Sequence, residues 1–121
     1  MIGIGVDAVD IARFRLSLER TRGLRDRLFT ARELADLASR ADPVPGLAAR
    51  FAAREATMKA MGLGLGAFGF HDVSVARSDR GAPLLVVVGR ADELARDRGI
   101  TSWHLSITHT ASVAIAYVTA S

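Results

Sequence analysis

One segment constrains the fold more than any other: the run RFAAREATMKAMGLGLG at residues 50–66. Its spacing predicts an α-helix that is apolar on nearly every side, which is typical of a buried helix. The run nevertheless carries four charged side chains: Arg50, Arg54, Glu55 and Lys59. Because a lone buried charge is costly, these side chains are expected to have partners, or to bind a ligand or metal.

Composition limits what can surround this helix. The 121 residues predict one domain, residues 1–121, and only 6% of them are aromatic, so the core must be mostly aliphatic. The chain has no cysteine, which excludes disulfide and thiolate chemistry. No apolar run approaches the roughly 18 residues of a membrane span, and MIGIGVD lacks the basic flank of a signal peptide, so we expect a cytoplasmic protein. The net charge of +3 is compatible with an anionic partner or with an ordinary soluble surface.

Strand and helix signals follow one another in an order typical of the α+β class. IGIGVD predicts a first strand, and Asp10 is expected to cap a helix that reaches about Arg22. The capping box TARE (residues 30–33) predicts a second helix, to about Arg40, and DPVPG opens the long helix. Two hairpins follow, with a short helix that ends at Gly99 between them: HDVSVAR with PLLVVV, and SWHLSITH with SVAIAYVT.

The first candidate site lies on the opening strand. Side chains alternate along a strand, so Gly3, Gly5 and Asp7 share one face. Two glycines beside an aspartate leave room for a ligand or for a neighbouring backbone. Alternatively, the glycines admit a neighbouring helix and Asp7 ends the strand at the surface. The stretch also fits G-x-G-x-x-A, but its glycines lie within the strand instead of after it, so the dinucleotide signal is weak.

The second candidate is the charged face of the long helix. Glu55 and Lys59 lie about 40° apart around the helix axis, among alanines that allow another element to pack closely. The alternative is an ordinary ion pair one turn apart, which contributes about 0.2–0.5 kcal/mol. Arg50 and Arg54 form a second stripe, which either grips phosphate groups or is a solvated helix face.

The third candidate is His109, at the end of the predicted strand in HLSITHT. It shares a face with apolar residues, so it is either a capped core residue or a functional one. Together the three places offer two carboxylates, an amine, two arginines and a histidine. One histidine is too few for a zinc site. Carboxylates with cations suit Mg²⁺ that bridges to phosphates, as phosphoryl-type transfer requires.

Four segments of the chain resemble the holo-acyl-carrier-protein synthases, the small members of the 4′-phosphopantetheinyl transferase superfamily: GIGVDAVDIARF, FAAREATMKAMGLG, DVSVARSDRGAPLLVVVGRADELA and WHLSITHT. The resemblance runs from about Ile2 to Val118. It implies the 4′-phosphopantetheinyl transferase fold, with a small mixed or antiparallel sheet packed on a long central helix. It also implies transfer of the phosphopantetheine arm of coenzyme A to a serine of an apo acyl carrier protein, with release of adenosine 3′,5′-bisphosphate.

The resemblance assigns a role to each candidate residue. Asp7 and Glu55 would bind the magnesium ion, and Lys59 would complete the catalytic set by holding the pyrophosphate. Contacts to coenzyme A would come from Lys59 and three further residues: Arg50, Gly62 and His109. The serine would lose its proton to a carboxylate or to a metal-bound water, and both alternatives stay open.

The resemblance also implies partners. The family is typically a homotrimer with active sites at subunit interfaces, so Asp7 and Glu55 of one copy would face Arg50 or His109 of another. Arg13, on the first predicted helix, would dock the acidic carrier protein. The carrier belongs to fatty-acid or to polyketide synthesis, and no nucleic acid or membrane partner is expected.

Two other classes of function compete with this interpretation. The first is a basic binding module without chemistry, for which Asp7 and Glu55 have no reason to converge. The second is another enzyme of coenzyme A, such as an acetyltransferase, which would hold the pyrophosphate on a glycine-rich loop and use no metal. GLGLGAFG resembles such a loop but follows a helix instead of opening one, so it lacks the favourable helix dipole.

Overall fold

The computed structural model describes all 121 residues and confirms the α+β class. In chain order its elements are β1 (Gly3–Asp10), α1 (Ile11–Arg20), α2 (Leu24–Leu28), α3 (Ala31–Leu37), α4 (Val44–Ala60), the 3₁₀ turn η1 (Phe70–Asp72), β2 (Val73–Arg77), β3 (Pro83–Val87), α5 (Gly89–Asp97), β4 (Trp103–His109) and β5 (Val113–Ala120).

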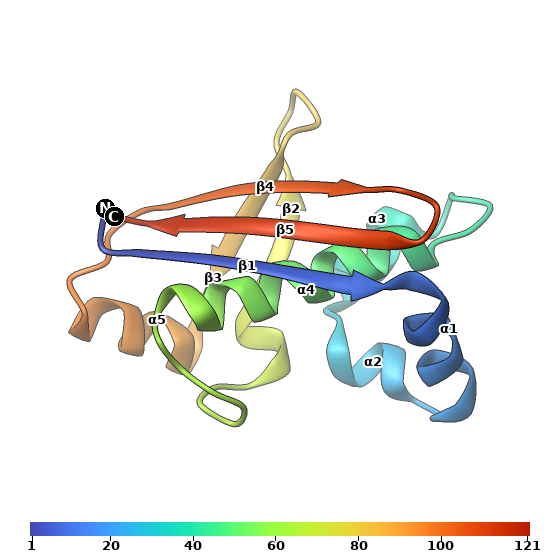
Figure 1. Cartoon of the computed structure of the whole chain (residues 1–121), viewed down its shortest axis with the longest axis horizontal. Helices are drawn as coiled ribbons and strands as arrows, with labels where there is room; N and C mark the ends of the chain where they lie inside the picture. The colour runs from blue at the N-terminus through green and yellow to red at the C-terminus, as the bar shows by residue number, and fades with distance from the viewer.

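An antiparallel sheet in the order β1-β5-β4 lies across the long helix α4 (Figure 1). The inner face of β1 and β5 carries mostly small residues, and Ala116 and Val118 of β5 are completely buried. The facing residues of α4, Ala52 and Ala56, are also completely buried. Small side chains on both sides let sheet and helix approach closely, as the alanine-rich pattern of the long helix predicts.

The two glycines of β1 are required by this close approach. A Cβ atom added to Gly5 would lie 1.9 Å from the carbonyl oxygen of Ala56, and one added to Gly3 would lie 1.9 Å from that of Ala60. The alternative that the glycines admit a neighbouring helix is therefore confirmed. Its second part is wrong, because β1 continues to Asp10 and Asp7 does not end the strand. The opposite face of β1 points outward, and Ile4 and Val6 are about half exposed there.

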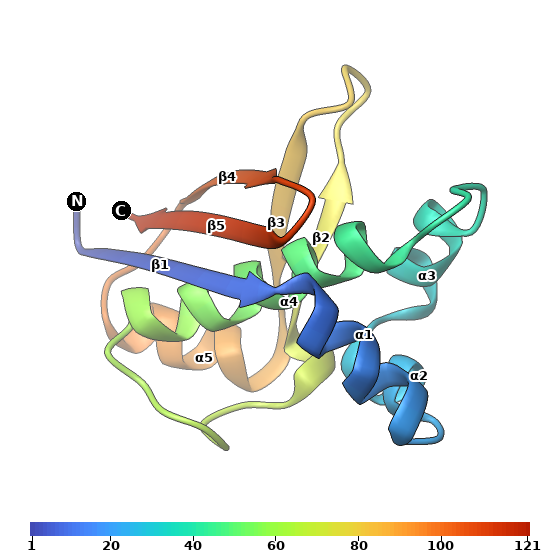
Figure 2. The same cartoon turned by 45° about the vertical axis from the view of Figure 1, so that its right-hand side comes forward.

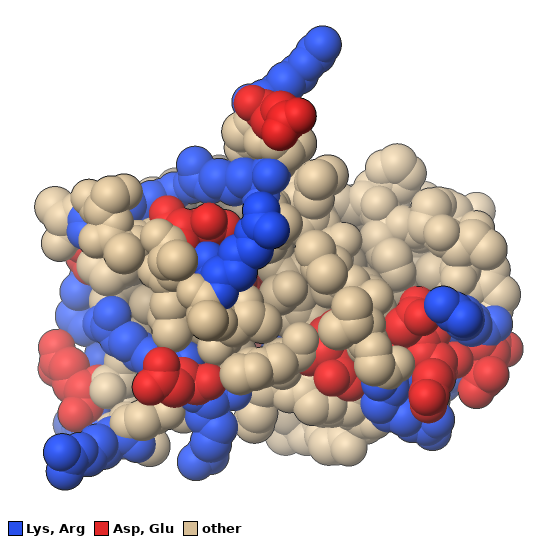
Figure 3. All heavy atoms as spheres, turned by 180° about the vertical axis from the view of Figure 1, so that it is seen from behind, with Lys and Arg blue, Asp and Glu red and all other residues tan.

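The strands β2 and β3 form a separate two-stranded antiparallel sheet that projects from the body (Figure 2). Its turn requires a left-handed backbone at Gly81, where φ is 83°. Seen from behind, the tip of this hairpin stands clear of the molecule and carries basic and acidic side chains (Figure 3).

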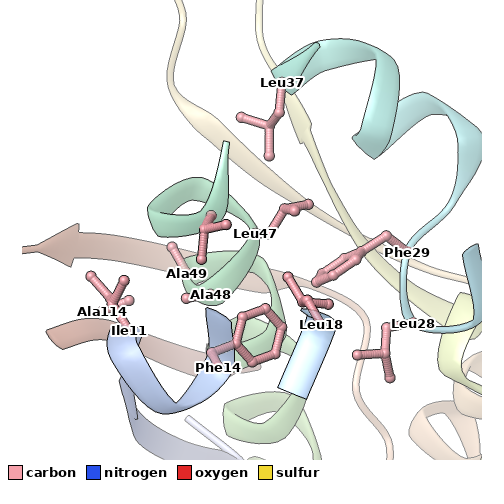
Figure 4. Packing of buried hydrophobic residues seen from close by; sticks show 11 residues of the cluster. Ile11, Phe14, Leu18, Leu28, Phe29, Leu37, Leu47, Ala48, Ala49 and Ala114 are labelled. Carbon is pink, nitrogen blue, oxygen red and sulfur yellow. The ribbon is translucent and has the colours of Figure 1, made fainter. Parts of the chain in front are cut away.

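The helices α1 to α3 cover the N-terminal half of α4. The predicted caps are present: Asp10 accepts a hydrogen bond from the amide of Arg13, and Thr30 forms the capping box with Glu33. Phe14 of α1 packs edge-to-face on Phe29, within a cluster that includes residues of α3 and α4 (Figure 4).

The sequence interpretation placed the ends of two helices too late. The first helix ends at Arg20 and not at Arg22, and α3 ends at Leu37 and not at Arg40. The short helix α2 was not predicted. It begins after Gly23, whose φ of 77° lets the chain turn sharply between α1 and α2. Its five residues are too few to show helical periodicity in the sequence.

Candidate active site

The first group of site residues forms where β1 passes over α4. Because the two glycines seat β1 on the helix, Asp7 comes within reach of the last turn of α4. The Nζ atom of Lys59 donates to Oδ1 of Asp7 and to the carbonyl oxygen of Val6, both at 3.0 Å. The side chain of Asp7 is 18% exposed and that of Lys59 is 56% exposed, so the pair faces solvent at one end.

Glu55 lies beside this pair, one turn earlier on α4. Its Oε1 atom accepts a 2.7 Å hydrogen bond from Nη1 of Arg54, and its side chain is 20% exposed. Glu55 and Asp7 line one surface hollow of about 310 Å³ together with Arg13. The structure therefore brings both predicted carboxylates, and the predicted docking arginine, to one place.

The carboxylate oxygens suit a magnesium ion. Asp7 and Glu55 each have one oxygen bonded to a cationic side chain, and the structure records no hydrogen bond to Oδ2 of Asp7 or to Oε2 of Glu55. No group of three protein ligands is present. Magnesium commonly binds through one or two carboxylates and completes its shell with water and substrate phosphates, so two free carboxylate oxygens fit this ion.

A second hollow, of about 210 Å³, lies beside the half of the β2–β3 hairpin that is nearer its turn. Arg50 and His109 line it, and the sequence analysis missed two further arginines there, Arg40 and Arg77. Basic side chains gather beside the hairpin on this side of the molecule (Figure 3). Arg77 ends the segment DVSVAR, to which no site role was assigned, and Arg40 belongs to no motif. Only the fold brings Arg40, after α3, next to the end of β2.

Arg50 is buried, which contradicts the alternative of a solvated helix face. Its Nε atom lies 3.9 Å from Oε2 of Glu33, and its Nη2 atom lies 3.9 Å from Oδ2 of Asp36. Both distances exceed hydrogen-bond length, and Nε has no hydrogen-bond partner. The unpartnered Nε and the two long ion-pair distances leave this buried cation incompletely compensated, so an anion in the adjoining hollow would complete its pairing. Burial also lowers the pKa of the guanidinium.

Glu33 was recognised from the sequence only as a capping residue. Its Oε1 atom closes the capping box, but its Oε2 atom accepts a hydrogen bond from the amide of Val75 in β2. Burial raises the pKa of this carboxyl. The Glu33 carboxylate thus connects the start of α3 to β2 through hydrogen bonds, and it lies 3.9 Å from Arg50.

The remaining predicted residues lie as follows. His109 is exposed at the end of β4, so it is not a capped core residue. Gly62 follows the C-cap of α4 with a φ of 69°, and a Cβ added there would meet open space. The two hollows share no lining residue: Asp7 and Glu55 line one, and Arg50 and His109 line the other.

Comparisons of the sequence and of the structure with known proteins identify the same family. Residues 3–118 match the 4′-phosphopantetheinyl transferase superfamily. A holo-acyl-carrier-protein synthase of Streptomyces avermitilis is 47% identical over 120 residues, which cover 99% of this chain and 97% of that protein. The crystal structure of the synthase from Neisseria meningitidis is similar with a TM-score of 0.88 and 31% identity, covering 100% and 98% of the two chains. That of Helicobacter pylori, solved in complex with coenzyme A, has a TM-score of 0.80 and 30% identity, covering 98% and 99%.

Proposed function

The chain belongs to the 4′-phosphopantetheinyl transferase superfamily, and we propose that Asp7, Glu55 and Lys59 carry out the reaction of this family. The family activity, shared with the holo-acyl-carrier-protein synthases, is transfer of the phosphopantetheine arm of coenzyme A to apo acyl carrier protein. The serine hydroxyl of the carrier loses its proton to a carboxylate or to a water molecule, and its oxygen forms a bond to the phosphorus that bears the arm. The bond from that phosphorus to the bridging oxygen breaks, and adenosine 3′,5′-bisphosphate leaves with the electron pair.

Both carboxylates line one hollow, and the ammonium group of Lys59 bonds to one of them, Asp7; this is the observation that supports these roles. Lys59 places its ammonium beside Asp7 at the open end of the pair, where it can contact the pyrophosphate and stabilise the charge that develops on the leaving oxygen. Asp7 and Glu55 would hold Mg²⁺. When bound, this ion neutralises phosphate charge and orients the phosphates, which phosphoryl-type transfer requires.

The second hollow is suited to the phosphates of the nucleotide. It combines the incompletely compensated Arg50 with His109 and two further arginines. This hollow and the one at Asp7 share no lining residue, which agrees with a site divided between copies. We infer that one copy of the chain contributes the carboxylates and another contributes Arg50 and His109. A shared site of this kind requires an oligomer, and we propose a homotrimer.

The outer face of the β1-β5-β4 sheet supports assembly of copies. Side chains of β1 and β5 form an exposed apolar surface there that no element of the chain covers, and it includes Ile4, Val6 and Tyr117. Val6 pairs with Tyr117 across the two strands. Exposed contiguous apolar surface on a sheet is typical of a protein interface.

The oligomeric state is directly measurable. We expect sedimentation velocity to give a trimer for the wild-type chain and smaller species for Val6→Glu, which places a charge on the apolar sheet face. Leu84→Glu is the matched control, because Leu84 is equally exposed but lies on the hairpin. A wild-type monomer under active conditions would contradict the shared site.

The acidic carrier protein is expected at the hollow that contains Arg13. This arginine lines the same hollow as Asp7 and Glu55. None of the helices is long and apolar enough to cross a membrane. We propose that the chain acts in the cytoplasm.

The experiment that tests the function is intact-mass analysis of an apo acyl carrier protein incubated with coenzyme A, magnesium and the chain. We expect the carrier to gain the mass of one phosphopantetheine group. Glu55→Gln keeps the side-chain size, so we expect a rate at least about 100-fold lower without unfolding. Glu93→Gln is the matched control, since Glu93 is exposed on α5 and paired only with Arg90. No mass gain with the wild-type chain, or an unchanged rate for Glu55→Gln, would contradict the proposal.

A further inference from the structure

Arg54 is a buried cation to which the proposed reaction assigns no role. It is only 4% exposed, and its Nε atom has no hydrogen-bond partner. Its guanidinium is compensated in two other ways. The Nη1 atom donates to Oε1 of Glu55 at 2.7 Å, and the planar group lies over two aromatic rings, 4.4 Å from the centroid of Phe70 and 5.3 Å from that of Phe68.

The contact with Glu55 fixes a side chain that the helix alone leaves free. Successive residues of an α-helix point about 100° apart, so neighbours along the chain do not normally face each other. Here the side chain of Arg54 bends so that Nη1 donates to Oε1 of its neighbour Glu55. The structure records no hydrogen bond to Oε2 of Glu55. A charge-assisted bond of 2.7 Å restricts the carboxylate to few orientations, as ligand-supporting partners do in metal sites.

The aromatic contacts join Arg54 to a different part of the chain. Phe68 lies near the end of the glycine-rich loop at residues 62–69, which connects α4 to η1, and Phe70 directly follows this loop. The loop contains three glycines with open space around them, two at positive φ: Gly62, Gly64 and Gly66. Such a loop can take several conformations, and the rings on Arg54 restrain its far end.

Building on the proposed function, we propose that Arg54 is a positioning residue that orients Glu55 for the metal and couples this orientation to the conformation of the 62–69 loop. The loop begins directly after the turn of α4 that carries Lys59, and it returns to α4 through the rings stacked on Arg54. A movement of the loop therefore reaches Glu55 through one side chain. Conversely, a metal held by Glu55 stiffens the loop.

The test compares Arg54→Met, which keeps apolar volume but removes the charge, with Arg54→Lys, which keeps the charge but removes the planar stacking surface. Arg96→Met is the matched control, because Arg96 is an exposed arginine on α5. Two measurements are made on the chain alone: its affinity for Mn²⁺ as a magnesium substitute, by titration calorimetry, and hydrogen exchange of the loop amides with and without Mn²⁺. Far-UV circular dichroism checks the fold.

We expect Arg54→Met to bind Mn²⁺ about 10- to 100-fold more weakly and to exchange its loop amides faster. Arg54→Lys should lie between Arg54→Met and wild type, and Arg96→Met should match wild type. Mn²⁺ should slow loop exchange in the wild-type chain but not in Arg54→Met. If Arg54→Met does not fold, Arg54→Lys decides: unchanged Mn²⁺ affinity and loop exchange in that variant would overturn the proposal.

A further variant isolates the coupling. Phe70→Leu keeps Arg54 and Glu55 but removes the closer ring. We expect faster loop exchange together with weaker Mn²⁺ binding, and faster exchange with unchanged Mn²⁺ affinity would overturn the coupling. These readouts are separate from the transfer assay. A wild-type chain that modifies the carrier while Arg54→Met binds Mn²⁺ normally refutes the role of Arg54 alone, whereas a wild-type chain without transferase activity refutes the proposed function.

Discussion

Replacement of Gly5 by alanine tests whether the contact between β1 and α4 sets both the stability and the geometry of the site. The added Cβ would lie 1.9 Å from the Ala56 carbonyl oxygen and 2.9 Å from the amide nitrogen of Ala60. Contacts below 3.0 Å to backbone do not occur in practice, so strand and helix must separate by about 1.1 Å or more. Neither obstacle is a side chain that can rotate away.

The expected cost follows from this forced separation. Overpacking of a filled interior costs about 1–3 kcal/mol, and the upper end applies because the obstacle is helix backbone. In a chain of this size about 3 kcal/mol corresponds to a loss of roughly 10 °C in Tm. Asp7 lies two residues further along β1, so it should also move relative to Glu55 and Lys59. A displacement of about 1 Å in a reacting group is enough to lower the rate about 100-fold.

Thermal unfolding followed by circular dichroism measures the first effect, and the mass gain of the carrier protein measures the second. Gly64→Ala is the control for stability, since an added Cβ there meets nothing within 4 Å and the backbone is not left-handed. We expect its Tm to stay within about 2 °C of wild type. The reasoning is refuted if Gly5→Ala melts as close to wild type as Gly64→Ala does.

Three further substitutions test other parts of the molecule. Burial raises the pKa of Glu33 above its ordinary 4.5, so its stabilising contribution is complete below 4.5 and is lost as the pH rises through the raised pKa. Glu33→Gln should remove this dependence of stability on pH. In urea titrations, the unfolding free energy of wild type should therefore increase relative to that of the variant as the pH falls from neutral towards 4.5. Lys59→Met should slow transfer at least about 10-fold with an unchanged circular dichroism spectrum, because the ammonium is half exposed and supports little packing; a wild-type rate would exclude Lys59 from the reaction. Arg13→Glu should slow transfer to the acidic carrier strongly at low salt and less at high salt, with unchanged coenzyme A binding by calorimetry, and equal rates at low salt would remove Arg13 from the docking surface.

Local patterns made much of the fold predictable. Alternation and glycine turns identified all five strands, and the capping box at Thr30 and the stop at Gly99 were found where the sequence placed them. Helix ends were less well determined, because nothing between Leu37 and Asp42 marks where α3 stops. The sheet order, with the last strand β5 between the first strand and β4, follows from packing of the whole chain and has no local signal.

The candidate site likewise contains residues that local motifs identify and residues whose environment depends on the whole fold. Asp7, Glu55 and Lys59 were identified because each lies within a recognisable motif, and the structure places them on adjoining elements. The burial of Arg50 and Arg54 was not predicted. Their partners come from α3 and from the segment after the glycine-rich loop, and these residues approach α4 only in the folded chain.

The position of β5 between β1 and β4 also bears on how the chain folds during synthesis. Gly3 pairs with Ala120, so almost the whole sequence separates the partners in the first and last strands (Figure 1). Because β5 is translated after every other element, the apolar surfaces of β1 and α4 that it covers stay exposed until it has been made. Contacts between such distant residues slow folding, and a chain interrupted before Val113 lacks the strand that joins the two edges of its sheet.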